Sequence, residues 1–261
     1  PAGVVNTVYG DGEDVVQPIM KSGKVNVLAF IGTSRVADII KKAHPKPHRL
    51  RSVLGLEAKN TAIILPDAIP ELTVSEVITG TLSYNGQRCT ALKMLFVHDS
   101  IFPEFINLFN QALKKLKLGM PWEEGVDITP LPEEGKAEFL DSLVKDAVSK
   151  GARIMNDHGG EYHGNLYYPA VVYPVNSEMK LYHVEQFGPV IPVASFKDIS
   201  EPLNYVIESN YGQQVSIFGR DSGRIAKLVD PLVNQVARVN INCQCQRGPD
   251  KFPFTGRKDS A

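Results

Sequence analysis

The chain has 261 residues, of which 43% are hydrophobic, and its formal net charge is −1 at pH 7. This composition is typical of a soluble globular protein, and the small net charge gives no reason to expect nucleic acid or an anionic membrane as a partner. The apolar runs are of strand length and too short to cross a bilayer. Three cysteines are an odd, sparse set that argues against a disulfide framework, so we predict a reducing, cytoplasmic location. Cys243 and Cys245 lack the partners of a zinc site, and we predict no metal.

The first part of the chain alternates turn, helix and strand signals, as α/β proteins do. We predict a helix over residues 13–21, a buried strand over 25–30, and a second helix that begins at the turn GTS, residues 32–34. Such a turn offers backbone N–H groups and hydroxyls to an anion such as a phosphate, although an ordinary helix cap is the alternative. Residues 41–49 contain two prolines and two histidines, and we expect an exposed loop with a solvated His44.

The rest of the chain continues this alternation. Strands are predicted at residues 61–65, 92–97, 170–175, 190–196, 215–218 and 238–242, and helices at 71–81, 101–116, 133–150, 202–208 and 222–229. Strands divided by helices predict a three-layer α/β/α fold with a mostly parallel sheet and helices on both faces. In such a fold, reactive loops lie at the carboxyl ends of the strands.

A polar loop, YNGQRCT at residues 84–90, follows the helix predicted over 71–81 and places Cys89 beside Arg88. A nearby positive charge favours the thiolate, which is the nucleophilic form of cysteine. The alternative is that Cys89 is a small residue without chemistry, and the loop alone does not decide between the two interpretations.

Four strings, in this order, resemble the aldehyde dehydrogenase superfamily. They are FIGTS (residues 30–34), NGQRC (85–89), EQFGPV (185–190) and FPFTGRKDS (252–260). Within that superfamily, RGPD at residues 247–250 is similar to the NADP-dependent, non-phosphorylating glyceraldehyde-3-phosphate dehydrogenases. The resemblance implies an aldehyde-dehydrogenase-like α/β fold, with residues 1–59 as the C-terminal part of a dinucleotide-binding domain and residues 60–261 as the catalytic domain. Because relatives continue on both sides, we expect the chain to belong to a longer protein that forms a homodimer or homotetramer.

The resemblance also implies a reaction, the oxidation of a small-molecule aldehyde with NADP or NAD as the cofactor. Cys89 would attack the aldehyde carbon to give a thiohemiacetal, hydride transfer would leave a thioester, and activated water would release the acid. Glu185 matches a carboxylate that binds the nicotinamide-side ribose, and Phe187 matches an aromatic residue beside the nicotinamide. Gly32 and Ser34 match the turn that approaches the pyrophosphate. A helix-end acid and a core ring are the alternatives for Glu185 and Phe187.

Two arginines indicate the substrate. Arg88 and Arg247 match positions that hold the substrate's phosphate in the glyceraldehyde-phosphate branch, and a planar guanidinium can pair two oxygens at once. We therefore predict glyceraldehyde 3-phosphate as the substrate. Succinic semialdehyde or another carboxylated aldehyde would be held by the same chemistry, and Arg247 has the alternative of a surface arginine at a turn.

One position departs from the family. Where members of the family usually have a glutamate, this chain has Gly55, and Glu57 lies two residues later. On a strand both positions would share a face, so Glu57 is our candidate for the base that activates water.

For the chain as a whole, the alternative to an enzyme is a non-catalytic binding or structural module. We expect these 261 residues alone to bind the cofactor poorly and to turn over little, because a divided sheet leaves the ligand crevice incomplete.

Overall fold

A computed structural model describes residues 1–249, 251 and 255–261. Parts of the strings RGPD and FPFTGRKDS, namely Asp250, Phe252, Pro253 and Phe254, therefore lie outside the described residues. The α-helices are α1 (Gly12–Lys21), α2 (Ser34–Ala43), α3 (Pro70–Leu82), α4 (Phe102–Leu113), α5 (Lys136–Ser149), α6 (Lys180–His183), α7 (Ser200–Glu208) and α8 (Ser222–Leu232), and two short 3-10 helices are η1 (Pro47–Arg49) and η2 (Ser83–Gly86). The strands are β1 (Val27–Ile31), β2 (Arg51–Gly55), β3 (Asn60–Ile64), β4 (Leu92–His98), β5 (Arg153–Ile154), β6 (Tyr162–His163), β7 (Leu166–Tyr167), β8 (Ala170–Tyr173), β9 (Val190–Phe196), β10 (Gln214–Phe218) and β11 (Arg238–Ile241).

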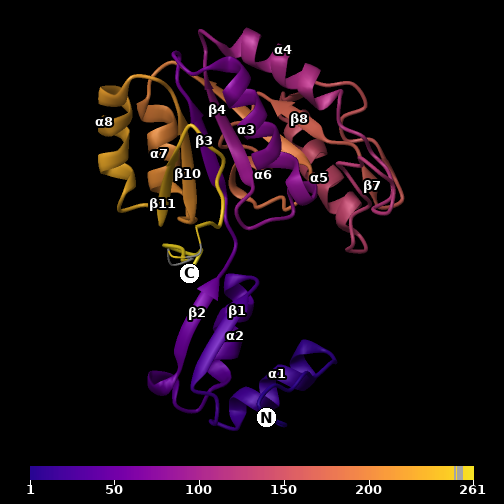
Figure 1. Ribbon diagram of the computed structural model, residues 1–261, viewed down its shortest axis with the longest axis vertical. Coiled ribbons are helices and arrows are strands. Elements are labelled where there is room, and N and C mark those ends of the chain that lie inside the picture. The colour runs from indigo at the N-terminus through magenta and orange to yellow at the C-terminus, as the bar shows by residue number, and fades with distance from the viewer. Residues whose placement is uncertain (250, 252–254) are drawn as a thin grey trace.

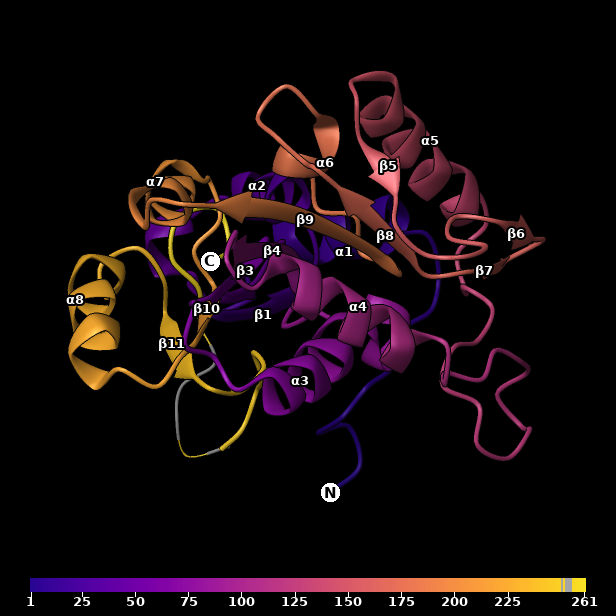
Figure 2. The same ribbon diagram turned by 90° about the horizontal axis from the view of Figure 1, so that it is seen from above.

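The larger lobe is built on a seven-stranded sheet with the order β11-β10-β3-β4-β9-β8-β5. Neighbouring strands are parallel except β5 and β8. Alternate residues of the central strands enter two separate cores, because successive side chains of a strand point to opposite faces. Ile63 and Phe96 pack with α5, α7 and α8, whereas Ile64 and Leu95 pack with α3 and α4. Figure 2 shows α5 and α7 on one side of the sheet and α3 and α4 on the other, so the predicted α/β fold with a mostly parallel sheet is confirmed.

A smaller lobe lies beneath this sheet (Figure 1). Its strands β1 and β2 pair in parallel as a separate two-stranded sheet, and its helices α1 and α2 contact each other. Residues 56–59 lead from β2 into β3 of the large sheet. The domain boundary predicted between residues 59 and 60 stays a prediction.

Several local predictions differ from the structure. The strand predicted as buried over residues 25–30 is β1, which is not buried: Val27 is 56% and Ile31 81% exposed, because this strand pairs with β2 in a small sheet. Helix α5 begins at Lys136 and not at residue 133, because Gly135 has a φ of 74° and cannot belong to the helix. Strand β2 was not predicted, since it begins with the polar pair Arg51 and Ser52 and its first three residues are exposed. His44 is not solvated: it is 3% exposed, and its Nε2 donates to the carbonyl oxygen of Val25 at 3.0 Å.

Within the described part of the chain, no helix combines the length and the apolar character that crossing a bilayer requires. The predicted homo-oligomer, the cytoplasmic location and the absence of nucleic-acid and metal partners stay predictions.

Candidate active site

Residues of both lobes line one cavity of about 890 Å³. Seven of the eight predicted site residues are in its wall: Gly32, Glu57, Arg88, Cys89, Glu185, Phe187 and Arg247. The eighth, Ser34, is not among the lining residues, but its backbone N–H donates to the carboxylate of Glu57 at 2.7 Å. The fold therefore brings together residues that are as far apart in sequence as 32 and 247.

The loop before Cys89 has a backbone that few residues adopt. Asn85 and Gly86 have φ values of 58° and 70°, in the left-handed region. A Cβ on Gly86 would lie 2.8 Å from the carbonyl oxygen of Gly188, so this position needs glycine to approach the EQFGPV segment closely. The Asn85 amide donates to the carbonyl oxygen of Thr129 at 3.0 Å and accepts from its N–H at 2.9 Å. These contacts fix the path of the chain into Cys89.

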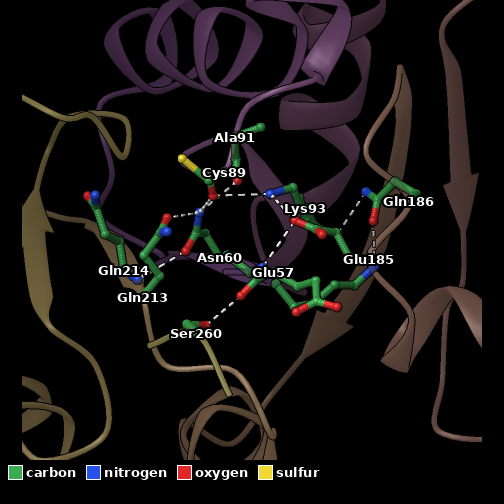
Figure 3. Close-up of polar contacts among 12 residues, drawn as sticks. Glu57, Asn60, Cys89, Ala91, Lys93, Glu185, Gln186, Gln213, Gln214 and Ser260 are labelled. Carbon is green, nitrogen blue, oxygen red and sulfur yellow. Dashed lines mark hydrogen bonds and ion pairs between the residues drawn. The ribbon is translucent and has the colours of Figure 1, made fainter. Parts of the chain in front are cut away.

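Figure 3 shows that the backbone carbonyl of Cys89 points into a polar network, whereas its sulfur points away from that network. Asn60 Nδ2 donates to this carbonyl oxygen at 2.7 Å, and Lys93 Nζ donates to it at 3.1 Å. Both donors lie at the beginning of central strands, β3 and β4. The Cys89 peptide is thus held by hydrogen bonds to the sheet. The Cys89 side chain is half-buried and does not belong to the core.

Lys93 also joins the Cys89 loop to Glu185. Its Nζ lies 2.7 Å from Glu185 Oε1 and 5.6 Å from the centroid of the Phe187 ring. The Lys93 side chain is 1% exposed and that of Glu185 is 13% exposed, so this ion pair is largely shielded from water. The Ala58 N–H donates to the same carboxylate oxygen at 3.0 Å. Glu185 is therefore held from two sides.

A second buried lysine supports the same region. Lys59 Nζ donates to the carbonyl oxygen of Val184 at 2.7 Å and to Gln186 Oε1 at 2.6 Å. Burial lowers the pKa of Lys59 well below its ordinary value, and the charge of Lys93 acts in the same direction. Sequence reasoning did not identify either lysine. The signal for Lys93 was a charge within the apolar run LKMLFV, since a lysine there is buried only with a partner.

Arg88 contributes positive charge to the cavity wall. Its Nη2 donates to Gln244 Oε1 at 3.1 Å, while its Nε is buried and has no hydrogen-bond partner among the described residues. Burial lowers the pKa of the Arg88 guanidinium. Arg247 is exposed and lines the same cavity. Two guanidinium groups in the wall of one cavity favour an anionic ligand there.

The reason we gave for choosing Glu57 is wrong, because β2 ends at Gly55 and Glu57 lies outside the strand. Its backbone carbonyl oxygen accepts from Ser260 Oγ at 2.6 Å, and its carboxylate accepts from the Ser34 N–H. Burial, together with the charges of Glu185 and Glu57, raises the pKa of Tyr211, another residue of the cavity wall, to about 12. The role of Glu57 as a base stays a prediction.

The model of the aldehyde dehydrogenase family matches residues 1–261. The chain belongs to the aldehyde dehydrogenase family. A relative from Arabidopsis thaliana, an NADP-dependent glyceraldehyde-3-phosphate dehydrogenase, is 36% identical over 260 residues, which are 100% of this chain and 51% of that protein. This aldehyde dehydrogenase chain thus spans about half the length of the curated relatives it matches.

Solved structures of aldehyde dehydrogenases show the same fold. The NADP-dependent glyceraldehyde-3-phosphate dehydrogenase from Bacillus halodurans, complexed with NADP, has a TM-score of 0.90 and 35% identity, over 97% of this chain and 52% of that one. A succinate-semialdehyde dehydrogenase from Burkholderia pseudomallei has a TM-score of 0.93 and 28% identity, over 100% of this chain and 53% of that one. The predicted family and fold are confirmed.

Proposed function

We propose that the protein to which this chain belongs oxidises a small anionic aldehyde to its acid, with NADP as the cofactor and glyceraldehyde 3-phosphate as the substrate. One observation carries this proposal: a half-buried cysteine, two arginines and the Glu185–Phe187 pair occur in the wall of one cavity. The relatives named above support the cofactor and an anionic substrate.

The cavity fits the nicotinamide end of NADP. Its volume is within the range of about 300–1,000 Å³ typical of small-molecule sites. Phe187 would offer its ring to the nicotinamide, and Glu185, held by Lys93, would accept hydrogen bonds from the adjacent ribose. When bound, NADP supplies the hydride acceptor for the oxidation. The pyrophosphate of NADP would meet the Ser34 N–H, which in this structure donates a hydrogen bond to the Glu57 carboxylate.

The residues of the chain account for the other steps. The Cys89 thiolate adds to the aldehyde carbon and forms a thiohemiacetal, while Arg88 and Arg247 hold the anionic group of the substrate. Loss of hydride from that carbon leaves a thioester on Cys89. Water, which Glu57 would deprotonate, then cleaves the C–S bond, releases the acid and returns the thiol.

A direct test uses the full-length protein and follows NADP reduction with three aldehydes: glyceraldehyde 3-phosphate, succinic semialdehyde and neutral propanal. We expect a higher kcat/KM for glyceraldehyde 3-phosphate than for the other two. The variant Cys89→Ser should lose more than about a thousandfold in rate, since it lacks the nucleophile. A preference for succinic semialdehyde would move the proposal to a carboxylated substrate. Absence of oxidation of all three would favour a non-catalytic module.

The phosphate role of Arg88 has its own test. The variant Arg88→Gln should raise KM for glyceraldehyde 3-phosphate by about 10- to 100-fold, because a hydrogen bond to a charged group is lost, and should leave kcat/KM for propanal nearly unchanged. Arg153→Gln, an exposed arginine of β5 outside the cavity, serves as the control. An equal loss for both aldehydes would contradict a role in anion recognition.

A further inference from the structure

The first turn of α2 already binds an anion, and that anion belongs to the chain itself. The Ser34 N–H donates to Glu57 Oε2 at 2.7 Å, across 23 residues of sequence. Such a short N–H···O⁻ contact is typical of a charge-assisted hydrogen bond. The carboxylate therefore lies where the free N–H groups and the positive end of the helix dipole meet.

This end of α2 is suited to a phosphate group. Ser34 is the first residue of a ten-residue helix, and the Thr33 side chain caps the next turn by accepting from the Val36 N–H at 3.3 Å. Gly32 and Thr33 line the cavity that contains Cys89, so an anion bound here would be continuous with a ligand at the thiol. Glu57 lines the same cavity, and its carboxylate is the group that an entering phosphate would have to displace.

The side chain of Glu57 can move away from Ser34, whereas its backbone is fixed. Its backbone carbonyl oxygen is held by Ser260 Oγ at 2.6 Å, and the neighbouring Leu56 N–H donates to the carbonyl oxygen of Ser260 at 3.2 Å. These contacts fix the backbone at residues 56–57, whereas rotation about the side-chain bonds can move the carboxylate away from Ser34.

From this geometry we infer that Glu57 is an internal competitor of the cofactor's diphosphate. The carboxylate satisfies the N-terminus of α2 in the free protein, and a dinucleotide binds only when Glu57 gives up Ser34. Glu57 thus weakens cofactor binding, through the lost hydrogen bond and through repulsion between two anions. The inference rests on the proposed use of NADP, but it concerns binding and not oxidation.

The test is a titration of the full-length protein with NADPH, followed by the fluorescence of the nicotinamide, without aldehyde. The variant Glu57→Gly removes the competing side chain and should bind NADPH about tenfold tighter or more. Glu57→Gln keeps the shape and an acceptor oxygen but removes the charge, so its Kd should lie between those of the wild type and Glu57→Gly. Glu71→Gln, an exposed carboxylate of α3 outside the cavity, should bind NADPH as the wild type does.

The outcomes separate this inference from the proposed function. Tighter binding by Glu57→Gly supports the inference even if no aldehyde is oxidised. Equal or weaker binding by Glu57→Gly overturns it, including the case in which neither protein binds NADPH, and that case also removes the proposed cofactor. Hydrolysis of the thioester is a separate readout: Glu57→Gln should slow it if Glu57 is also the base, and an unchanged rate would reject that role alone.

Discussion

Lys93 shows how one side chain can organise several groups of the candidate site. Its ammonium contacts the carbonyl oxygen of Cys89, the carboxylate of Glu185 and the face of the Phe187 ring. Glu185 lies 92 residues further along the chain than Lys93. Because the ion pair is buried, removal of one partner leaves a charge without compensation in a region of low dielectric constant.

The variant Lys93→Met should lower the free energy of unfolding by about 3–5 kcal/mol, as is typical when one partner of a buried ion pair is lost. Adding Glu185→Gln should recover part of this loss, because the uncompensated charge disappears. Urea unfolding of the full-length protein measures both effects. Lys145→Met is the matched control, since its ion pair with Asp141 has the same 2.7 Å distance but lies on the surface, and it should change little. Equal losses for the two lysine variants would contradict the argument.

The buried thiol of Cys245 should make the free energy of unfolding depend on pH in the alkaline range. Cys245 is fully buried, with its sulfur 3.2 Å from Ser216 Oγ, and burial raises the pKa of its thiol to about 12. The unfolded thiol ionises near its ordinary pKa, so the folded state is favoured below that value and loses this advantage as the pH rises towards 12.

We therefore expect the free energy of unfolding to fall between about pH 9 and 11, with this thiol contributing about 1.4 kcal/mol for each pH unit. Cys245→Ala removes that share, so the difference between variant and wild type should shrink as the pH rises, while tyrosines contribute equally to both proteins. Chemical unfolding at several pH values provides the measurement. Parallel pH profiles would show that the thiol is not the cause.

At the scale of elements, the turn η2 controls how closely two loops approach. Gly86 combines a φ of 70° with a Cβ position that would lie 2.7 Å and 2.8 Å from two backbone oxygens. Gly125 has a similar φ of 73°, but no heavy atom lies within 4 Å of its Cβ position. The two glycines separate the cost of the backbone conformation from the cost of crowding.

Gly125→Ala should lower the free energy of unfolding by ~1 kcal/mol, the cost of the left-handed conformation alone. Gly86→Ala should cost more than about 2 kcal/mol and also reduce kcat, because the crowded Gly188 carbonyl precedes the strand β9 and follows Phe187. Thermal or urea unfolding and aldehyde oxidation give the two readouts. If Gly86→Ala is no less stable than Gly125→Ala, the loops that contain Gly86 and Gly188 can move apart without a cost in free energy, and the argument from crowding fails.

Six of the seven strands of the central sheet were predicted, most of them because they are apolar runs that lie between helices on both sides. The seventh, β5, was not predicted, because it has only two residues and both are exposed. Residues 190–196 were predicted as a strand and form β9 as Val190–Phe196. Strand β2 was not predicted either, because among the described residues it pairs with β1 alone and its side chains are mostly exposed. The Glu57–Ser34 contact could not be predicted, since it depends on where that unrecognised strand ends. The pairing of Lys93 with Glu185 depends on the order of β4 and β9, which local patterns do not contain.

At the scale of the whole 261-residue chain, the small lobe has little apolar cover. Val27 is 56% exposed, Ile31 81% and Val53 58%, and all three lie in the two-stranded sheet of β1 and β2. A two-stranded sheet is marginally stable by itself, and a ligand crevice on such a sheet is poorly organised.

The 261 residues alone should therefore bind NADPH at least about tenfold more weakly than the full-length protein, and they should oxidise aldehydes slowly or not at all. The same fluorescence titration and NADP-reduction assay compare the two proteins. Rapid aldehyde oxidation by the 261-residue chain would refute this expectation.

The hydrogen bonds of Ser260 restrict motion between the two lobes. Ser260 is fully buried, it bonds to residues 56 and 57 at the joint, and its Oγ accepts from the Gly212 N–H at 3.2 Å in the large lobe. Figure 1 shows the C-terminus beside this joint. Ser260 therefore ties the joint to the large lobe, because any hinge opening at residues 56–57 would have to break these hydrogen bonds first. The variant Ser260→Ala, which removes the two hydrogen bonds of Oγ, would loosen this connection.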